Sequence, residues 1–199
     1  MGAAERDEFL RAAWRALVSE EVDADRLVFV DEMGANVSLS ALYAWSRKGK
    51  RAFGSAPRNW GKNITLLASI TEASLGPCLA VEGSTTREVF EAYLQEGLAP
   101  SLRPGQVVVM DNLSAHKGQR VKEIIEGRGA ELLYLPPYSP DFNPIEQAFS
   151  KVKGLLRKAQ ARTRESLIEA MGRALSGLTA LDARGFFANC GDRKVVQPL

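Results

Sequence analysis

Cysteine, histidine and long apolar runs are all scarce in this sequence of 199 residues. The two cysteines, Cys78 and Cys190, lack neighbouring metal-ligand residues, which argues against a disulfide framework and against a structural zinc site. No apolar run reaches the length of about 18 residues that a membrane-spanning helix requires. The acidic start MGAAERDEF is unlike a secretion signal. We therefore expect a soluble cytoplasmic protein with reduced thiols.

The net charge of +2 conceals an uneven distribution of charge along the chain. Residues 1–46 carry 4 basic and 9 acidic groups, whereas residues 47–64 carry 6 basic groups and no acid. Residues 65–150 carry 6 basic and 11 acidic groups, and residues 151–199 carry 10 and 4. Such blocks are most often solvated faces. Basic stripes beside clustered acids also fit a site that needs metal and nucleic acid together.

Apolar periodicity predicts an α/β fold with a mixed sheet in one domain, preceded by a helical lead-in at residues 1–25. The domain itself is expected to span residues 26–199. Helices are expected at residues 5–21, 85–98, 117–127, 143–159, 163–178 and 182–189. Strands are expected at residues 26–31, 36–39, 42–45, 63–71, 77–81, 106–111 and 131–135.

Two of the predicted strands end in an aspartate: RLVFV is followed by Asp31, and QVVVM by Asp111. Acids at the carboxyl edge of an α/β sheet lie where such sheets bind ligands. Glu146 follows a stiff loop containing four prolines and is expected at the same edge. Three carboxylates without a His or Cys cluster favour Mg²⁺ or Mn²⁺, and two such ions can promote phosphoryl transfer.

Glu146 also has a simpler interpretation, as part of a helix cap. Asn143 suits the N-cap position and Pro144 the first helical position, which puts Glu146 at the third position of a capping box. Glu32 is expected to point away from Asp31 if the strand continues, and so to lie beside the site or on the surface. The match of three acids in one plan favours the metal site over the caps.

Three segments resemble the catalytic domain of DDE transposases: MDN at 110–112, His116, and PPYSPDFNPIE at 136–146. The resemblance is closest to the bacterial insertion-sequence branch of the mariner superfamily, and it extends from about residue 27 to residue 191. The 34 residues between Asp111 and Glu146 match the DD34E spacing of that superfamily. On this resemblance Asp31, Asp111 and Glu146 correspond to the three catalytic metal ligands.

The resemblance implies an RNase H-like fold, a mixed five-stranded sheet flanked by helices, with an N-terminal lead-in helix and C-terminal helices. It implies Mg²⁺-dependent or Mn²⁺-dependent cleavage at element ends and strand transfer into target DNA. The implied partners are double-stranded DNA and a second copy of the chain, in a homodimeric synaptic complex associated with a prokaryotic nucleoid. Relatives carry an N-terminal helix-turn-helix region that we expect to be absent here. The alternatives are a stand-alone RNase H-like nuclease and a catalytically idle DNA-binding remnant.

Further residues are expected beside the site or on DNA. Asn112, His116 and Asn143 are candidates to lie next to the acids or near DNA, although a lone histidine is more often structural. The basic residues that would contact phosphates lie in the block after residue 46 and on the Glu146 helix: Arg47, Lys48, Lys50, Arg51, Arg58, Lys153 and Arg157. A solvated surface explains these charges equally well, and Trp45 and Trp60 are more readily explained as core residues than as stacking platforms.

Overall fold

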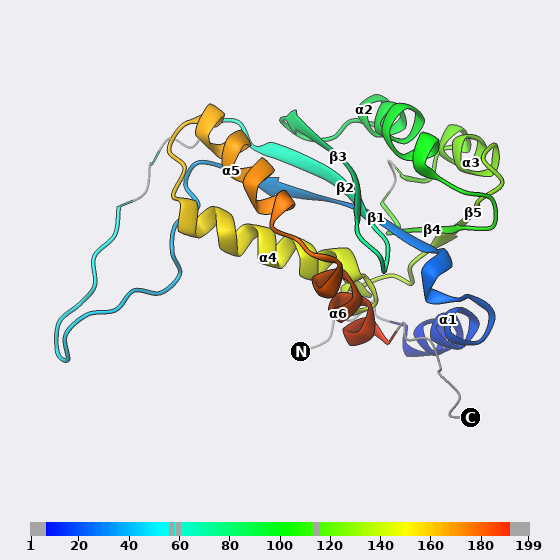
Figure 1. Cartoon of the computed structure of the whole chain (residues 1–199), viewed down its shortest axis with the longest axis horizontal. Coiled ribbons are helices and arrows are strands. Elements are labelled where there is room, and N and C mark those ends of the chain that lie inside the picture. The colour runs from blue at the N-terminus through cyan, green and yellow to red at the C-terminus, as the bar shows by residue number, and fades with distance from the viewer. Residues whose placement is uncertain (1–6, 56–57, 59–60, 114–115, 192–199) are drawn as a thin grey trace.

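The computed structural model describes residues 7–55, 58, 61–113 and 116–191, which form helices and strands as in an α/β protein (Figure 1). The helices are α1 (Glu8–Glu21), α2 (Arg87–Ala92), α3 (Gln119–Glu126), α4 (Pro144–Ala159), α5 (Arg164–Ser176) and α6 (Ala180–Cys190). The strands are β1 (Leu27–Ala35), β2 (Ile64–Ile70), β3 (Leu75–Glu82), β4 (Val107–Met110) and β5 (Glu131–Tyr134). A π-helical turn, Tyr93–Leu98, continues α2. No described helix is long and apolar enough to cross a membrane.

The five strands form one mixed sheet in the order β3-β2-β1-β4-β5. The pairs β1–β2 and β2–β3 are antiparallel, whereas β1–β4 and β4–β5 are parallel. Strands β2 and β4 are buried along their whole length, as expected for apolar strands covered by helices on both faces. The predicted mixed five-stranded sheet flanked by helices is therefore confirmed.

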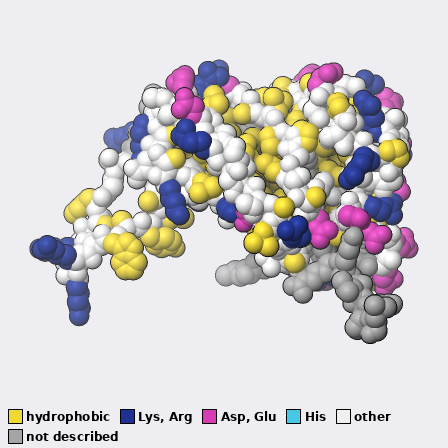
Figure 2. Space-filling view, viewed as in Figure 1, with side chains coloured by type: hydrophobic (Ala, Val, Ile, Leu, Met, Phe, Trp, Pro, Cys, Tyr) yellow, Lys and Arg dark blue, Asp and Glu magenta, His cyan; other side chains and the backbone are white. Residues whose placement is uncertain are grey.

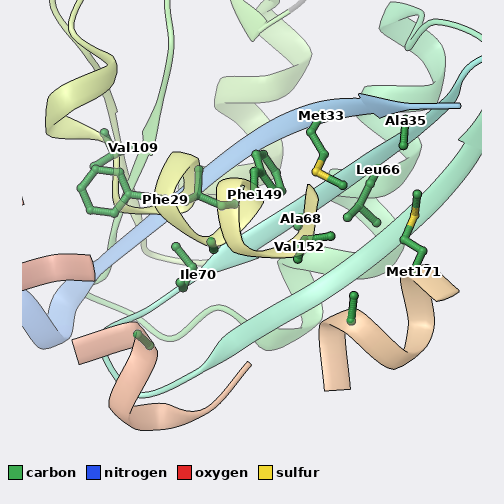
Figure 3. Packing of buried hydrophobic residues seen from close by; sticks show 14 of the residues in the cluster. Phe29, Met33, Ala35, Leu66, Ala68, Ile70, Val109, Phe149, Val152 and Met171 are labelled. Atoms are coloured by element: carbon green, nitrogen blue, oxygen red, sulfur yellow. The ribbon is translucent and has the colours of Figure 1, made fainter. Parts of the chain in front are cut away.

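Alternation along β1 divides the core into two layers. Leu27, Phe29 and Met33 belong to the cluster that also contains the buried residues of α4, α5 and α6. Val28 and Val30 point the other way, into a cluster with α2, the π-helical turn and α3. Figure 3 shows the first layer, in which α4 lies over the central strands. Asp31 is two residues after Phe29, so the pleat directs its side chain to the α4 face.

Strand β1 continues to Ala35 instead of ending at Asp31, which corrects the expected boundary. Asp31 pairs with Ala68 of β2, and the ladder continues through Ala35 and Ile64. The strand continues because Met33 and Ala35 still bury apolar side chains after the acid pair. Asp31 thus lies in the middle of a strand, whereas Asp111 directly follows β4 as predicted.

The two strands expected at residues 36–39 and 42–45 are wrong. In the described part of residues 36–63 no residue belongs to a strand, and the chain instead forms an arm that projects from the body (Figure 1). Leu42, Tyr43, Trp45 and Phe53 of this arm are largely exposed, with Trp45 fully so. Their apolar pattern resembles that of a strand, but these four exposed side chains are not packed in either core cluster of the described residues.

Arg162 fixes the base of the arm to the helical layer. Its guanidinium donates hydrogen bonds of 3.0 Å to the backbone carbonyls of Val37 and Leu39, and one of 3.4 Å to that of Ser55. Figure 2 shows basic and hydrophobic side chains along the projecting part. The arm therefore leaves the body from a defined point and exposes both kinds of side chain.

Candidate functional site

Asp31, Asp111 and Glu146 line one pocket of about 590 Å³. The parallel register pairs Val30 of β1 with Met110 of β4, so the two aspartates follow at adjacent positions on neighbouring strands. Neighbouring strands lie about 4.8 Å apart, which places these two carboxylates close together. Glu146 reaches the pocket from the first turn of α4. The structure thus brings together the three acids singled out in the sequence.

Asp31 is buried, with 7% of its surface exposed. One carboxylate oxygen accepts a hydrogen bond of 2.7 Å from the backbone N–H of Glu32, and the other accepts one of 2.8 Å from Asn143 Nδ2. Burial is the largest cause that raises the pKa of Asp31 to about 7. The negative charges of Asp111 and Glu146 contribute to this raised pKa, against the lowering effect of the Glu32 N–H. A cation placed among these acids would relieve that repulsion.

Asp111 is held by hydrogen bonds from residues that follow β4 in the sequence. His116 Nδ1 lies 2.5 Å from Oδ1 of Asp111, and the backbone N–H of Leu113 donates to the same oxygen at 3.1 Å. His116 is buried and stacks on Phe90, with ring centroids 4.2 Å apart. Its backbone carbonyl accepts a 2.7 Å hydrogen bond from the Tyr134 hydroxyl. The single histidine of the chain therefore holds one oxygen of Asp111 from a packed position outside the pocket lining.

Asn143 lies at the N-cap position of α4, but its side chain does not cap the helix. Its amide donates instead to Asp31, and its backbone carbonyl accepts a 3.2 Å hydrogen bond from the N–H of Glu146. Among the described residues, Asn143 Oδ1 is buried without a hydrogen-bond partner. The capping-box interpretation of Glu146 is therefore wrong, while Pro144 does occupy the first helical position. Asn143 connects the first acid to the third.

The remaining wall of the pocket comes from Asn112 and the proline-rich loop. Asn112 Nδ2 donates a 2.7 Å hydrogen bond to the carbonyl of Leu135, which ties the end of β4 to the end of β5. Tyr138 in the loop has a φ of 54°, a left-handed conformation that side chains other than glycine rarely adopt. The loop is thus held in a specific shape at the cost of about 1 kcal/mol or more.

Glu32 also lines the pocket, whereas the sequence predicted that it points away from Asp31 and lies beside the site or on the surface. The expectation that it would lie away from Asp31 followed from strand alternation, and β1 does continue past it. One carboxylate oxygen of Glu32 is buried without a hydrogen-bond partner among the described residues. The only signal in the sequence was its place beside Asp31 in the VDE motif.

The oxygen ligands offered by the three acids are chemically suited to a hard divalent cation. Asp31, Asp111 and Glu146 supply only oxygen, as Mg²⁺ and Mn²⁺ prefer. In the described part of the chain, no three or more His, Cys, Asp or Glu side chains are arranged closely enough to hold an ion as they stand. Asp31 and Asp111 each have one oxygen bound to a neighbouring side chain, Asn143 and His116 respectively. The donor chemistry therefore fits such an ion, although the three carboxylates would have to move closer together to hold one.

The basic residues proposed for DNA lie apart from the pocket. None of the seven is among the residues that line it in the described part of the chain. Four are exposed on the arm, Arg58 is exposed nearby, and Lys153 and Arg157 are half-buried on α4. Trp45 is exposed, so the expectation that it packs in a core is wrong, and Trp60 lies outside the described residues.

Comparison with known proteins places these observations in a family context. The family described as DDE superfamily endonuclease matches residues 26–168. The Tcb1 transposase of Caenorhabditis briggsae is similar to this chain, with 27% identity over 108 residues that cover 52% of this chain and 40% of that protein. The Tc1 transposase of Caenorhabditis elegans is 23% identical over 164 residues, which cover 68% and 60% respectively. The chain thus spans only part of the length of these relatives.

Solved structures show the same fold. The Mos1 transposase paired-end complex with left transposon end has a TM-score of 0.77 and 17% identity, covering 95% of this chain and 59% of that one. The Mos1 mariner paired-end complexes with Mn and with Mg have TM-scores of 0.71 and 0.66 and identities of 17% and 18%. They cover 94% and 92% of this chain, and 58% and 56% of the Mos1 chains. This likeness establishes the RNase H-like fold.

Proposed function

The chain belongs to the DDE superfamily endonuclease family, and from that premise we propose that it is the catalytic part of a transposase. Its reaction would be hydrolysis of a DNA phosphodiester at a transposon end, followed by attack of the freed 3′-hydroxyl on target DNA. Both steps are phosphoryl transfers with no covalent protein intermediate. The names of the similar Tcb1 and Tc1 transposases support this proposal.

One observation carries the proposal: acids from β1, from the residue after β4 and from α4 line a single pocket. Asp31, Asp111 and Glu146 lie far apart in the sequence, and the parallel register of β1 and β4 brings the first two together. The proline-rich loop then directs α4 so that its first turn faces them. A set of structural caps would not need all three at one cavity.

Asp31, Asp111 and Glu146 are the residues that would hold the cations, Mg²⁺ or Mn²⁺. Two bound ions would supply an activated nucleophile and stabilisation of the leaving oxygen. Asn143 and His116 would orient Asp31 and Asp111 by holding one oxygen of each. The raised pKa of Asp31 means that the group would release a proton when a cation binds. The existence of Mos1 complexes with Mn and Mg supports this choice of ion.

Double-stranded DNA is the proposed substrate. The arm carries Arg47, Lys48, Lys50 and Arg51, all exposed, and would neutralise phosphates beyond the pocket. Phosphate contacts fix position without specifying sequence, so recognition of a particular end would need a further DNA-reading region. We propose that two copies of the chain act together on two ends, which agrees with the paired-end nature of the similar Mos1 complexes.

Two finer assignments belong to the same proposal. Within the family we assign the chain to the bacterial insertion-sequence branch of the mariner superfamily, on the strength of the FNPIE motif at 142–146 and the spacing from Asp111. We also propose that residues 26–199 form the catalytic domain and that residues 1–25 lead into it.

The test is cation-dependent nicking of supercoiled DNA at low salt. Wild type should nick with Mg²⁺ or Mn²⁺ and stop on addition of EDTA. Asp31→Asn, Asp111→Asn and Glu146→Gln should each lower the rate by about 100-fold or more, because each removes a charge worth several kcal/mol to the transition state. Glu126→Gln is the matched control, since this exposed glutamate pairs with Lys122 on α3. Nicking that survives all three substitutions refutes the proposed site.

A strand-transfer assay separates transposase from stand-alone nuclease. A pre-cleaved transposon end with a free 3′-hydroxyl, supplied with target DNA and Mn²⁺, should become joined to the target. A chain that nicks efficiently but never joins such an end would be the nuclease. A chain that binds DNA but shows no response to cation or to Asp111→Asn would be the idle remnant.

A further inference from the structure

Helix α1 lies outside the region matched by the endonuclease family. Its side chains nevertheless contact the loop that leads to Glu146. Arg11 of α1 donates two hydrogen bonds to Asp141, of 3.0 Å from Nη1 to Oδ1 and 2.6 Å from Nη2 to Oδ2. The Arg11 side chain is only 5% exposed, whereas that of Asp141 is half exposed. The pair joins residues 130 positions apart in a bidentate, partly buried geometry.

A second layer of contacts surrounds Phe142, the residue after Asp141. The Trp14 ring stacks on it with centroids 5.4 Å apart and an interplanar angle of 11°. The guanidinium groups of Arg11 and Arg15 lie 4.1 Å and 4.4 Å from the centre of the same ring. Phe142 is buried, and these groups from α1 contact one part of it. Adjacent turns on one side of the helix therefore converge on two consecutive loop residues.

The two loop residues contacted by α1 directly precede residues that line the pocket. Asp141 and Phe142 belong to the 3-10 turn Pro140–Phe142, whose end is closed by a hydrogen bond from the Asn143 N–H to the Pro140 carbonyl. Asn143 then holds Asp31 and begins α4, which carries Glu146. The turn is short and contains proline, so it has little freedom to absorb a shift of Asp141.

We propose that Arg11 is a positioning residue for the pocket, acting through Asp141, and that α1 is a working part of the catalytic domain. Loss of the Arg11–Asp141 hydrogen bonds would move Asn143 and the first turn of α4 relative to Asp31. This inference depends on the proposed function, because it takes the pocket to be the cation site. It would extend the proposed catalytic domain from residues 26–199 to include α1, so that the lead-in segment also supports the pocket.

The test is a double-mutant cycle with Arg11→Lys, Asp141→Asn and both together, with Mn²⁺ binding measured by calorimetry in the absence of DNA. Arg11→Lys keeps the positive charge and a long side chain but cannot form the bidentate hydrogen bonds to Asp141. Each single variant should bind Mn²⁺ about 10-fold more weakly, as when a residue that orients a ligand is lost. The double variant should be no weaker than the single ones, because both substitutions break the same pair. Glu169→Gln, which breaks an exposed pair with Arg173 on α5, is the control.

Thermal unfolding separates positioning from general destabilisation. The Mn²⁺ effect should persist at temperatures where every variant is fully folded by circular dichroism. Folded variants with wild-type Mn²⁺ affinity, or losses that add in the double variant, overturn the inference. Should Arg11→Lys fail to fold, Asp141→Asn at its half-exposed position decides the matter alone by the same criterion.

Failure of the proposed function gives a different result. In that case Glu146→Gln, like the α1 variants, would leave Mn²⁺ binding unchanged. Mn²⁺ binding that is lost in Glu146→Gln but intact in Asp141→Asn overturns only the role of α1.

Discussion

Asp31 combines burial, a fixed hydrogen-bond pattern and two negative neighbours. Its folded pKa of about 7 lies above the ordinary value of 3.8, so the folded chain keeps a proton that the unfolded chain releases. Stability from this group is therefore complete below pH 3.8 and is lost as the pH rises to about 7. The group makes the cation-free fold less stable at neutral pH than at acid pH, which agrees with the proposed cation site.

Asp31→Asn should consequently stabilise the cation-free protein at pH 8. The expected gain in unfolding free energy is on the order of a few kcal/mol and should shrink toward zero near pH 4, where both carboxyl and amide are neutral. Urea unfolding in EDTA at several pH values measures it. A gain that is the same at pH 4 and pH 8 would contradict the raised pKa.

Asn143 and Thr163 offer a contrast between two N-cap positions. Asn143→Ala should lower nicking by about 10-fold to 100-fold, since it removes the donor to Asp31. Thr163→Ala removes a true capping box at the start of α5 and should cost about 1 kcal/mol of stability with nicking unchanged. Nicking rates and urea midpoints of both variants test the contrast. Equal loss of nicking in the two would mean that Asn143 acts only on stability.

At the scale of elements, α4 carries both the pocket and the core. Phe149 is 2% exposed and packs with Val152 against the central strands (Figure 3). Phe149→Ala should destabilise the fold by about 3–5 kcal/mol, because it leaves a cavity in a well-packed layer. Lys158→Ala on the exposed side of α4 should change stability by less than about 0.5 kcal/mol. Urea unfolding compares them, and equal costs would contradict the assigned faces.

Strands with a continuous apolar run were predictable from the sequence. The end of β1 and the conformation of the arm were not, because they depend on which other parts of the chain pack against them. β4 and β5 were correctly expected because their runs of valine and leucine are bounded by turns. The end of β1 was missed because an acid pair resembles a strand terminus, although Met33 and Ala35 are buried beyond it. The arm was taken for strands because apolar residues alone do not reveal that no neighbour covers them.

The gathering of Asp31, Asp111 and Glu146 at one pocket was predictable from the sequence, even though β1 runs on past Asp31. The contacts that support this pocket were not. Arg11 and Asp141 are separated by 130 residues, and nothing local to either signals the pair. Asn143 carries an obvious local role as a cap, and only the tertiary structure shows that its side chain serves Asp31 instead.

At the scale of the whole molecule, the charged arm should govern salt dependence rather than folding. Replacing Arg47, Lys48, Lys50 and Arg51 by glutamine should flatten the dependence of DNA affinity on salt, by up to about 0.9 in logarithmic slope for each phosphate that is no longer neutralised. The thermal midpoint should not change, since all four side chains are exposed. Filter binding from low to moderate salt measures the slope. An unaltered slope would mean that the arm does not meet DNA.

Asp31 lies four residues before the end of β1, with paired backbone on both sides of it. The paired residues between Asp31 and Ala35 therefore hold Asp31 in place independently of the arm, which begins after Ala35. The arm could thus be lengthened, shortened or replaced without moving the first carboxylate. Pocket and arm are separable in this architecture, so that an arm grafted from another chain should change the outer surface of the protein while leaving the arrangement of the three acids intact.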